Sequence, residues 1–77
     1  MTIVRSPLPG VFYRRPNPES DPYAVEGDHV SVGAVVGLIE IMKTFHEVIS
    51  DAEGTVERFL ADDGALVDVG QDLLELL

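Results

Sequence analysis

The chain has 77 residues, enough for one small domain whose packed core is marginal for its size. It has no cysteine, which excludes disulfides and thiolate metal sites. Its net charge of −9 makes nucleic acid or an anionic membrane an improbable partner, because phosphate contacts need lysine or arginine. The start Thr2-Ile3-Val4-Arg5 does not resemble a signal peptide, and the longest apolar stretch, residues 34–39, is too short to span a bilayer. We therefore expect a single domain over residues 1–77, and its lack of cysteine fits a cytoplasmic location.

Short runs of valine, isoleucine, leucine and phenylalanine follow one another along the chain, separated by glycine, proline and aspartate. Helical periodicity is weak throughout, so an all-β fold is expected. The C-terminal segment also allows a short helix, but the internal repeat described next favours a strand. In chain order, the predicted strands are residues 3–5, 11–13, 29–30, 35–41, 44–50, 55–60, 66–67 and 73–76.

The sequence carries an internal duplication. Residues 27–33 align with 64–70 at an offset of 37, around a shared V-x-V-G, whereas residues 10–12 align with 54–56 at an offset of 44. The first half therefore holds seven extra residues, in an interval that includes the proline-rich segment 15–22. Because proline interrupts a central strand, this segment is predicted to protrude. We expect a flattened eight-stranded barrel or sandwich of two halves related by a pseudo-two-fold axis, with a protrusion on the first half only.

Lys43 is the only lysine of the chain, and it lies where the two halves meet. If strands 35–41 and 44–50 form a tight hairpin, its amine stands at the tip. Two-residue hairpin turns favour Asn-Gly or Asp-Gly, because both central residues take positive φ. Met42 and Lys43 in that turn would be strained, and such strain is more common at functional sites. The alternative is that both residues continue a strand and the turn lies elsewhere.

The combination of E-x-M-K with flanking G-x-x-V-x-V-G motifs in a duplicated β domain resembles the biotinyl domains of biotin-dependent carboxylases. The resemblance covers essentially the whole chain and is greatest to the biotin carboxyl carrier proteins of acetyl-CoA carboxylases. The glycine and valine motifs are weak, since lipoyl domains share them, but the Met42-Lys43 pair in this context is specific. Lipoyl domains usually have aspartate in place of Met42. Glu40 is implied to help attaching enzymes distinguish the two kinds of domain.

The resemblance implies that biotin is joined to Lys43 as an amide. In that scheme biotin carboxylase supplies a carboxyl group, and carboxyltransferase passes it to acetyl-CoA to give malonyl-CoA for fatty acid synthesis. The domain itself is a non-catalytic carrier, and biotin protein ligase is its third partner. The protruding segment corresponds to a "thumb" beside the biotin, formed here by Pro16, Asn17, Pro18, Glu19, Ser20, Asp21 and Pro22.

Two residues depart from the usual pattern of the family. Ile41 replaces a frequent alanine, and Thr44 replaces a large apolar residue after the lysine, which is expected to weaken recognition by a biotin ligase. Two alternatives stay open: a lipoyl carrier of a 2-oxo-acid dehydrogenase or glycine cleavage system, and an unmodified interaction module of the same fold.

The remaining polar candidates have simpler interpretations. His29 and His46 lack a serine, cysteine or carboxylate at diagnostic spacing and are expected to be ordinary surface or half-buried residues. Asp62 and Asp63 lie in a turn-like context and are expected to be solvated rather than part of an acid–base or metal site. The thumb is also compatible with a plain surface loop.

Overall fold

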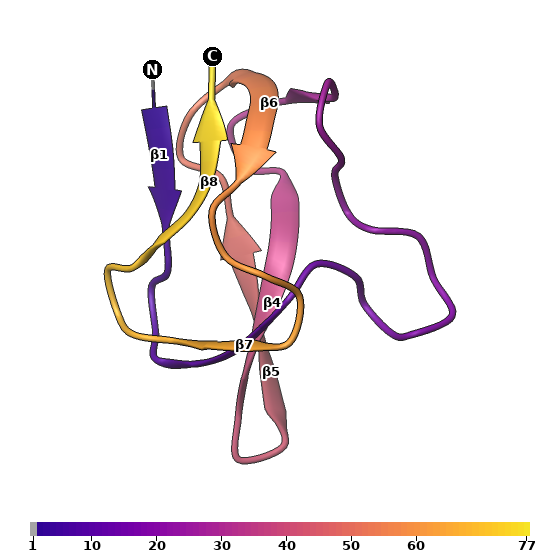
Figure 1. Cartoon of the computed structure of the whole chain (residues 1–77), viewed down its shortest axis with the longest axis vertical. Coiled ribbons are helices and arrows are strands. Elements are labelled where there is room, and N and C mark those ends of the chain that lie inside the picture. The colour runs from indigo at the N-terminus through magenta and orange to yellow at the C-terminus, as the bar shows by residue number, and fades with distance from the viewer. Residues whose placement is uncertain (1) are drawn as a thin grey trace.

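The computed structural model describes residues 2–77, and within them every regular element is a β-strand. The strands form two four-stranded sheets, in the orders β1-β8-β6-β3 and β5-β4-β2-β7 (Figure 1). All neighbouring strands are antiparallel. The strands are β1 (Thr2–Arg5), β2 (Gly10–Tyr13), β3 (His29–Val30), β4 (Val35–Ile41), β5 (Thr44–Ile49), β6 (Gly54–Phe59), β7 (Ala65–Val67) and β8 (Asp72–Leu76).

Each predicted strand is present, and no strand end differs from its predicted position by more than one residue. The C-terminal segment is strand β8, not a helix, as the repeat indicated. No described residues form a helix long and apolar enough to cross a membrane.

The predicted pseudo-two-fold relation holds strand by strand. Strands β1, β2, β3 and β4 correspond to β5, β6, β7 and β8, and the two sheets have the same order under this exchange. The register corresponds as well, because Thr2 pairs with Leu76 just as His46 pairs with Ile39. Thr2 and His46 are 44 residues apart in the sequence, and Ile39 and Leu76 are 37 apart, so these pairs reproduce both offsets of the sequence duplication. The seven extra residues lie between β2 and β3, where Figure 1 shows a long purple loop projecting from the body.

Two further pairs of residues repeat the same local chemistry in both halves. The hydroxyls of the buried Ser6 and Ser50 each donate to the carbonyl oxygen two residues on, at 2.6 Å. Gly10 lies so close to β4 that an added Cβ would stand 2.5 Å from the Glu40 carbonyl oxygen, and Gly54 meets the Leu77 carbonyl in the same way. Side chains are excluded at both crossings, so the halves share their packing and not only their topology.

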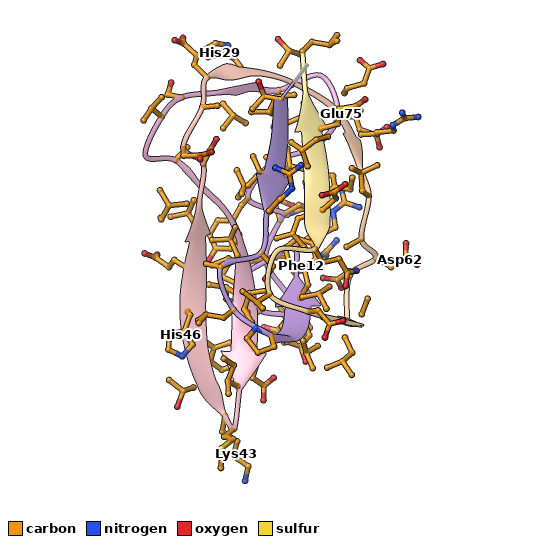
Figure 2. The ribbon with its side chains drawn as sticks, turned by 90° about the vertical axis from the view of Figure 1, so that its left-hand side faces the viewer. Phe12, His29, Lys43, His46, Asp62 and Glu75 are labelled. Carbon is orange, nitrogen blue, oxygen red and sulfur yellow. The ribbon has the colours of Figure 1, made fainter. Side chains whose placement is uncertain are left out.

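The core lies between the two sheets and is made of aliphatic side chains around Phe12, which is fully buried at the centre (Figure 2). Glu75 is the exception, a charged residue that is only 5% exposed on β8. Its carboxylate pairs with Nε of Arg58 at 3.4 Å, so the charge is buried with a partner. The two chain ends lie together at one end of the sandwich, and the β4–β5 hairpin extends at the other (Figure 1).

Candidate functional site

Lys43 stands at the tip of the β4–β5 hairpin, where Figure 2 shows its side chain projecting beyond the sheets. Ile41 and Thr44 are the last paired residues of the two strands, so Met42 and Lys43 form a two-residue turn. Their φ angles are 49° and 67°. Both central residues therefore have positive φ, as expected for the tight hairpin and contrary to a continuing strand.

The turn leaves its two central side chains without packing partners. Met42 is 93% exposed, and Lys43 makes no ion pair or hydrogen bond within the described part of the chain. A primary amine held clear of the body by two paired strands is accessible to a large enzyme. Met42 is apolar and almost fully exposed, so it is not part of the core.

Replacing the turn by Asn-Gly tests whether its backbone is strained. We expect Met42→Asn/Lys43→Gly to raise the free energy of unfolding by about 1 kcal/mol, because asparagine and glycine adopt positive φ at lower cost. Urea unfolding monitored by circular dichroism measures this change. Lys43→Ala is the control, since it removes the amine without relieving the strain and is not expected to stabilise. Equal stability of the Asn-Gly variant and the wild type would contradict the interpretation.

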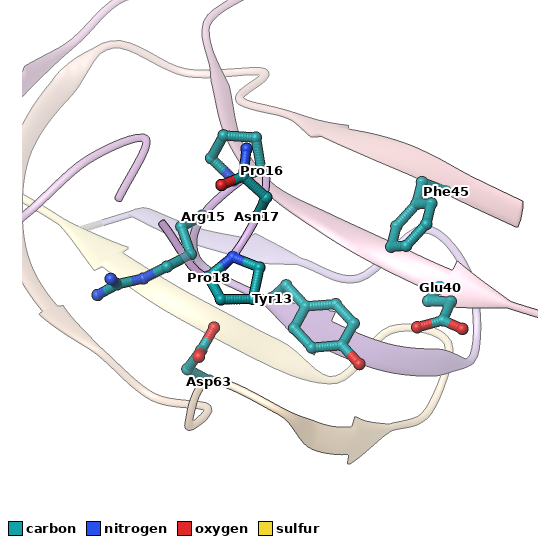
Figure 3. Close-up of a pocket in the computed structure, with 8 residues that line it drawn as sticks. All are labelled: Tyr13, Arg15, Pro16, Asn17, Pro18, Glu40, Phe45 and Asp63. Atoms are coloured by element: carbon teal, nitrogen blue, oxygen red, sulfur yellow. The ribbon is translucent and has the colours of Figure 1, made fainter. Parts of the chain in front are cut away.

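A pocket of about 480 Å³ lies between the thumb and the outer face of the hairpin (Figure 3). Its lining combines ring side chains with a few polar groups: Tyr13, Arg15, Pro16, Asn17, Pro18, Glu40, Phe45 and Asp63. Glu40 pairs across the strands with Phe45 on β5 and with Val11 on β2. The ring centroids of Tyr13 and Phe45 are 6.4 Å apart and tilted by 49°, an arrangement that aromatic pairs favour.

The thumb is closed by its own hydrogen bonds. Tyr23 N donates to Arg14 O at 2.9 Å across its base, and Ser20 N donates to Asn17 O at 3.2 Å within it. The Asn17 side-chain oxygen accepts from Glu19 N at 3.0 Å. Together with its three prolines, these bonds restrict the segment to few conformations. The thumb therefore forms one wall of the pocket, and its own hydrogen bonds hold the shape of that wall.

Asp63, which comes from the second half of the chain, also lines this pocket and is bonded to the chain next to the thumb. Its carboxylate accepts a hydrogen bond from the backbone N–H of Arg14 at 2.7 Å, two residues before the thumb. The Arg14 guanidinium in turn stacks on the Phe59 ring at 3.8 Å. Asp63 is exposed as expected, but it also fixes the start of the thumb.

The predicted site residues thus fall into separate groups. Met42, Lys43 and Thr44 occupy the exposed tip, and Glu40, Pro16, Asn17 and Pro18 line the pocket. The rest of the thumb, Glu19, Ser20, Asp21 and Pro22, does not line it. Sequence reasoning missed four residues that line the pocket: Tyr13, Arg15, Phe45 and Asp63. One signal in the sequence could have indicated this pocket. Phe45 is a large apolar residue two positions after the lysine, on a strand with an exposed face.

The two histidines lie apart from the pocket. His29 is exposed near the chain ends, where Nε2 lies 2.9 Å from a Glu53 carboxylate oxygen, and His46 is exposed on β5. Both are ordinary surface residues, as expected. The described residues contain no group of three or more side chains that could hold a metal ion.

Glu40 raises the pKa of the Tyr13 hydroxyl, mainly by accepting its hydrogen bond, while burial and the charges of Glu40 and Asp63 act in the same direction. A raised pKa means that the neutral hydroxyl is favoured in the folded state. Its contribution to stability is therefore present below the ordinary tyrosine pKa of 10.0 and is lost as the pH rises through the folded pKa. We expect Glu40→Gln to move the Tyr13 ionisation to lower pH in an ultraviolet difference titration, with Tyr13→Phe identifying its signal. An unmoved transition would contradict the contact.

The fold and the tip together define a class of protein: a small β sandwich of two equivalent halves that presents one exposed lysine amine at the tip of a hairpin. The chain belongs to the biotin/lipoyl attachment family, whose model, described as "Biotin-requiring enzyme", matches residues 2–76.

Similar curated proteins agree with this assignment. The biotin carboxyl carrier protein of acetyl-CoA carboxylase 2, chloroplastic, from Arabidopsis thaliana is 40% identical over 70 residues, which are 91% of this chain and 28% of that protein. The biotin carboxyl carrier protein of acetyl-CoA carboxylase from Haemophilus influenzae is 36% identical over 72 residues, 94% of this chain and 46% of that protein. The chain thus spans between about a quarter and a half of the length of these relatives.

A solved structure shares the fold. The urea carboxylase of Kluyveromyces lactis superimposes with a TM-score of 0.80 and 30% sequence identity, over 99% of this chain and 6% of that one. The all-β fold of two four-stranded sheets is therefore that of the biotin/lipoyl attachment family.

Proposed function

We propose that this chain is the biotin carboxyl carrier domain of an acetyl-CoA carboxylase, with biotin attached through an amide to Nζ of Lys43. The observation that carries the proposal is the only lysine of the chain, exposed on a strained turn at the tip of a hairpin, in a chain of this family. The names of the relatives support biotin, and not lipoic acid, as the group attached.

The residues present fit the cofactor in two respects. Lys43 is exposed and unpaired within residues 2–77, so an amide at Nζ breaks no existing contact. The nearby pocket offers ring faces and hydrogen-bonding groups on a scale typical of small-molecule sites. When bound, biotin supplies a ureido nitrogen that can take up and give up a carboxyl group.

The contribution of the domain itself is to position the Lys43 amine and the group attached to it. Lys43 must lose a proton to a base of the ligase before Nζ attacks the activated carboxyl group of biotin, because no side chain of residues 2–77 pairs with its amine. The rigid hairpin then holds the attached arm on one end of the sandwich. Tethering makes each visit to a partner active site effectively intramolecular.

Three partners follow from this role: biotin protein ligase, biotin carboxylase and carboxyltransferase. Each contact must be weak, because a carrier that binds tightly cannot leave. The net charge of −9 suits steering towards basic surfaces more than tight binding. The chain acts as a non-catalytic component in this proposal, and a cytoplasmic location stays a prediction from the sequence.

Intact mass after modification tests the proposal. The chain is incubated with a biotin ligase, biotin and ATP, and in parallel with a lipoate ligase and lipoic acid. We expect one biotin per chain, formed slowly because Thr44 follows the lysine, and no lipoyl adduct. A lipoyl adduct alone would establish the lipoyl carrier instead. No adduct from either ligase, including the ligase of the native host, would leave an unmodified interaction module.

A further inference from the structure

Met42 is the one sulfur-containing residue in the described part of the chain. The sequence has no cysteine and two methionines, and the other methionine, Met1, lies outside the described residues. A thioether reacts with mild oxidants to give a sulfoxide, which a methionine sulfoxide reductase can reverse. Residues 2–77 therefore contain a single position for reversible oxidation at sulfur, and that position is next to Lys43.

The fold leaves this thioether open to solvent. Met42 is 93% exposed, the highest value among the exposed large apolar side chains of the described residues. It is not part of the packed core, and it does not line the pocket beside the thumb. A small oxidant can therefore reach the sulfur without any opening of the fold.

The turn itself gives no structural reason for a methionine. The φ angle of Met42 is 49°, a conformation that asparagine, aspartate and glycine adopt at lower cost. Met42 gains no core packing that could offset this cost. What it does contribute is a flexible apolar side chain that adapts to an apolar surface on a partner.

Any enzyme that acts on Lys43 must also meet Met42. Adjacent Cα atoms are only about 3.8 Å apart, so a surface that encloses the Lys43 amine covers its neighbour as well. Oxidation converts the apolar thioether into a polar sulfoxide. In an apolar contact the added oxygen is a hydrogen-bond acceptor without a donor, and an unpaired buried acceptor weakens binding.

We propose that Met42 is a site of reversible oxidation and that its sulfoxide slows the attachment of biotin to Lys43. The inference rests on the proposed function, because it concerns the loading of that same lysine. In the forward step the sulfur attacks one oxygen of hydrogen peroxide, the O–O bond breaks, and sulfur gives up two electrons as water leaves. In the return step two thiols supply two electrons and two protons, so the sulfoxide oxygen leaves as water and a disulfide forms.

The test compares the reduced and the oxidised chain. The unmodified chain is treated with hydrogen peroxide, catalase then removes the peroxide, and peptide fragmentation locates the added oxygen. We expect one oxygen on Met42. Time courses of intact mass with a fixed amount of biotin ligase should show biotinylation slowed by about tenfold, the cost of one unpaired buried acceptor. Reductases for both sulfoxide epimers should restore the original rate.

Matched variants carried through the same steps separate Met42 from other effects of peroxide. Met42→Leu keeps an apolar side chain without sulfur and retains Met1, so its rate should be the same before and after peroxide. Met42→Gln places an uncharged polar amide at the tip. Its rate should be close to that of the oxidised wild type and should not change with peroxide. Circular dichroism shows that each form is folded.

Three results would overturn the inference: no oxygen on Met42, equal rates for the reduced and the oxidised wild type, or an equal slowing of Met42→Leu by peroxide. Failure of the proposed function is a different result. It would appear as the absence of a biotin adduct on the reduced wild type, and the effect of oxidation on loading would fall with it.

Discussion

Moving the amine by a single residue, in the variant Met42→Lys/Lys43→Arg, is expected to slow biotinylation on the order of a hundredfold. Successive residues of the turn project in different directions, and a small misplacement of a reacting group is enough for a loss of this size. The single variant Lys43→Arg should form no side-chain adduct at all, because it contains no other lysine. Time courses of intact mass with a fixed amount of biotin ligase measure both rates.

A lysine added elsewhere provides the control for this experiment. Glu57→Lys places an exposed amine on β6, away from the hairpin, and should give one adduct at the wild-type rate and no second one. Equal rates for the wild type and the displaced lysine would show that position in the turn does not matter. The geometric argument for the tip would then be wrong.

Phe12→Ala is expected to have the largest effect on stability, a loss of about 3–5 kcal/mol in the free energy of unfolding. The Phe12 side chain is fully buried in the middle of β2, and a Cβ added at Gly37 would lie only 2.5 Å from its ring. Truncation leaves a cavity that the paired strands around it cannot close. Small domains are stable by only about 5–15 kcal/mol, so a large fraction of the total is removed.

Urea unfolding followed by circular dichroism measures this loss. Leu66→Ala is a suitable control, because Leu66 is 80% exposed and its truncation should change stability by no more than about 0.5 kcal/mol. A loss below about 1 kcal/mol for Phe12→Ala would contradict the central role of this ring.

The strands and the turn were predictable because their signals are local. Alternation of apolar residues, the glycines and the two alignment offsets determined eight strands, the pairing of the halves and the place of the seven-residue insertion. The same local reasoning identified Met42 and Lys43 as an unusual turn, and their positive φ values confirm it. The roles of Glu40, Met42, Thr44 and the thumb stay predictions.

The pocket could not be predicted because it is assembled by tertiary structure. Tyr13 on β2 and Asp63 from the second half of the chain lie far from the hairpin in the sequence, and only the folded structure brings them to Glu40. Glu75 illustrates the same limit, since nothing in the segment DLLEL distinguishes a buried, paired carboxylate from an exposed one. Such features depend on which strand lies opposite, and a single sequence does not state this directly.

The central claim is that Lys43 carries the cofactor, and peptide fragmentation of the biotinylated wild-type chain tests it most directly. We predict that the whole mass increment of one biotin lies on the peptide containing Lys43 and on that residue itself. An increment on the N-terminal amine, or none on Lys43 after treatment with the ligase of the native host, would contradict the claim.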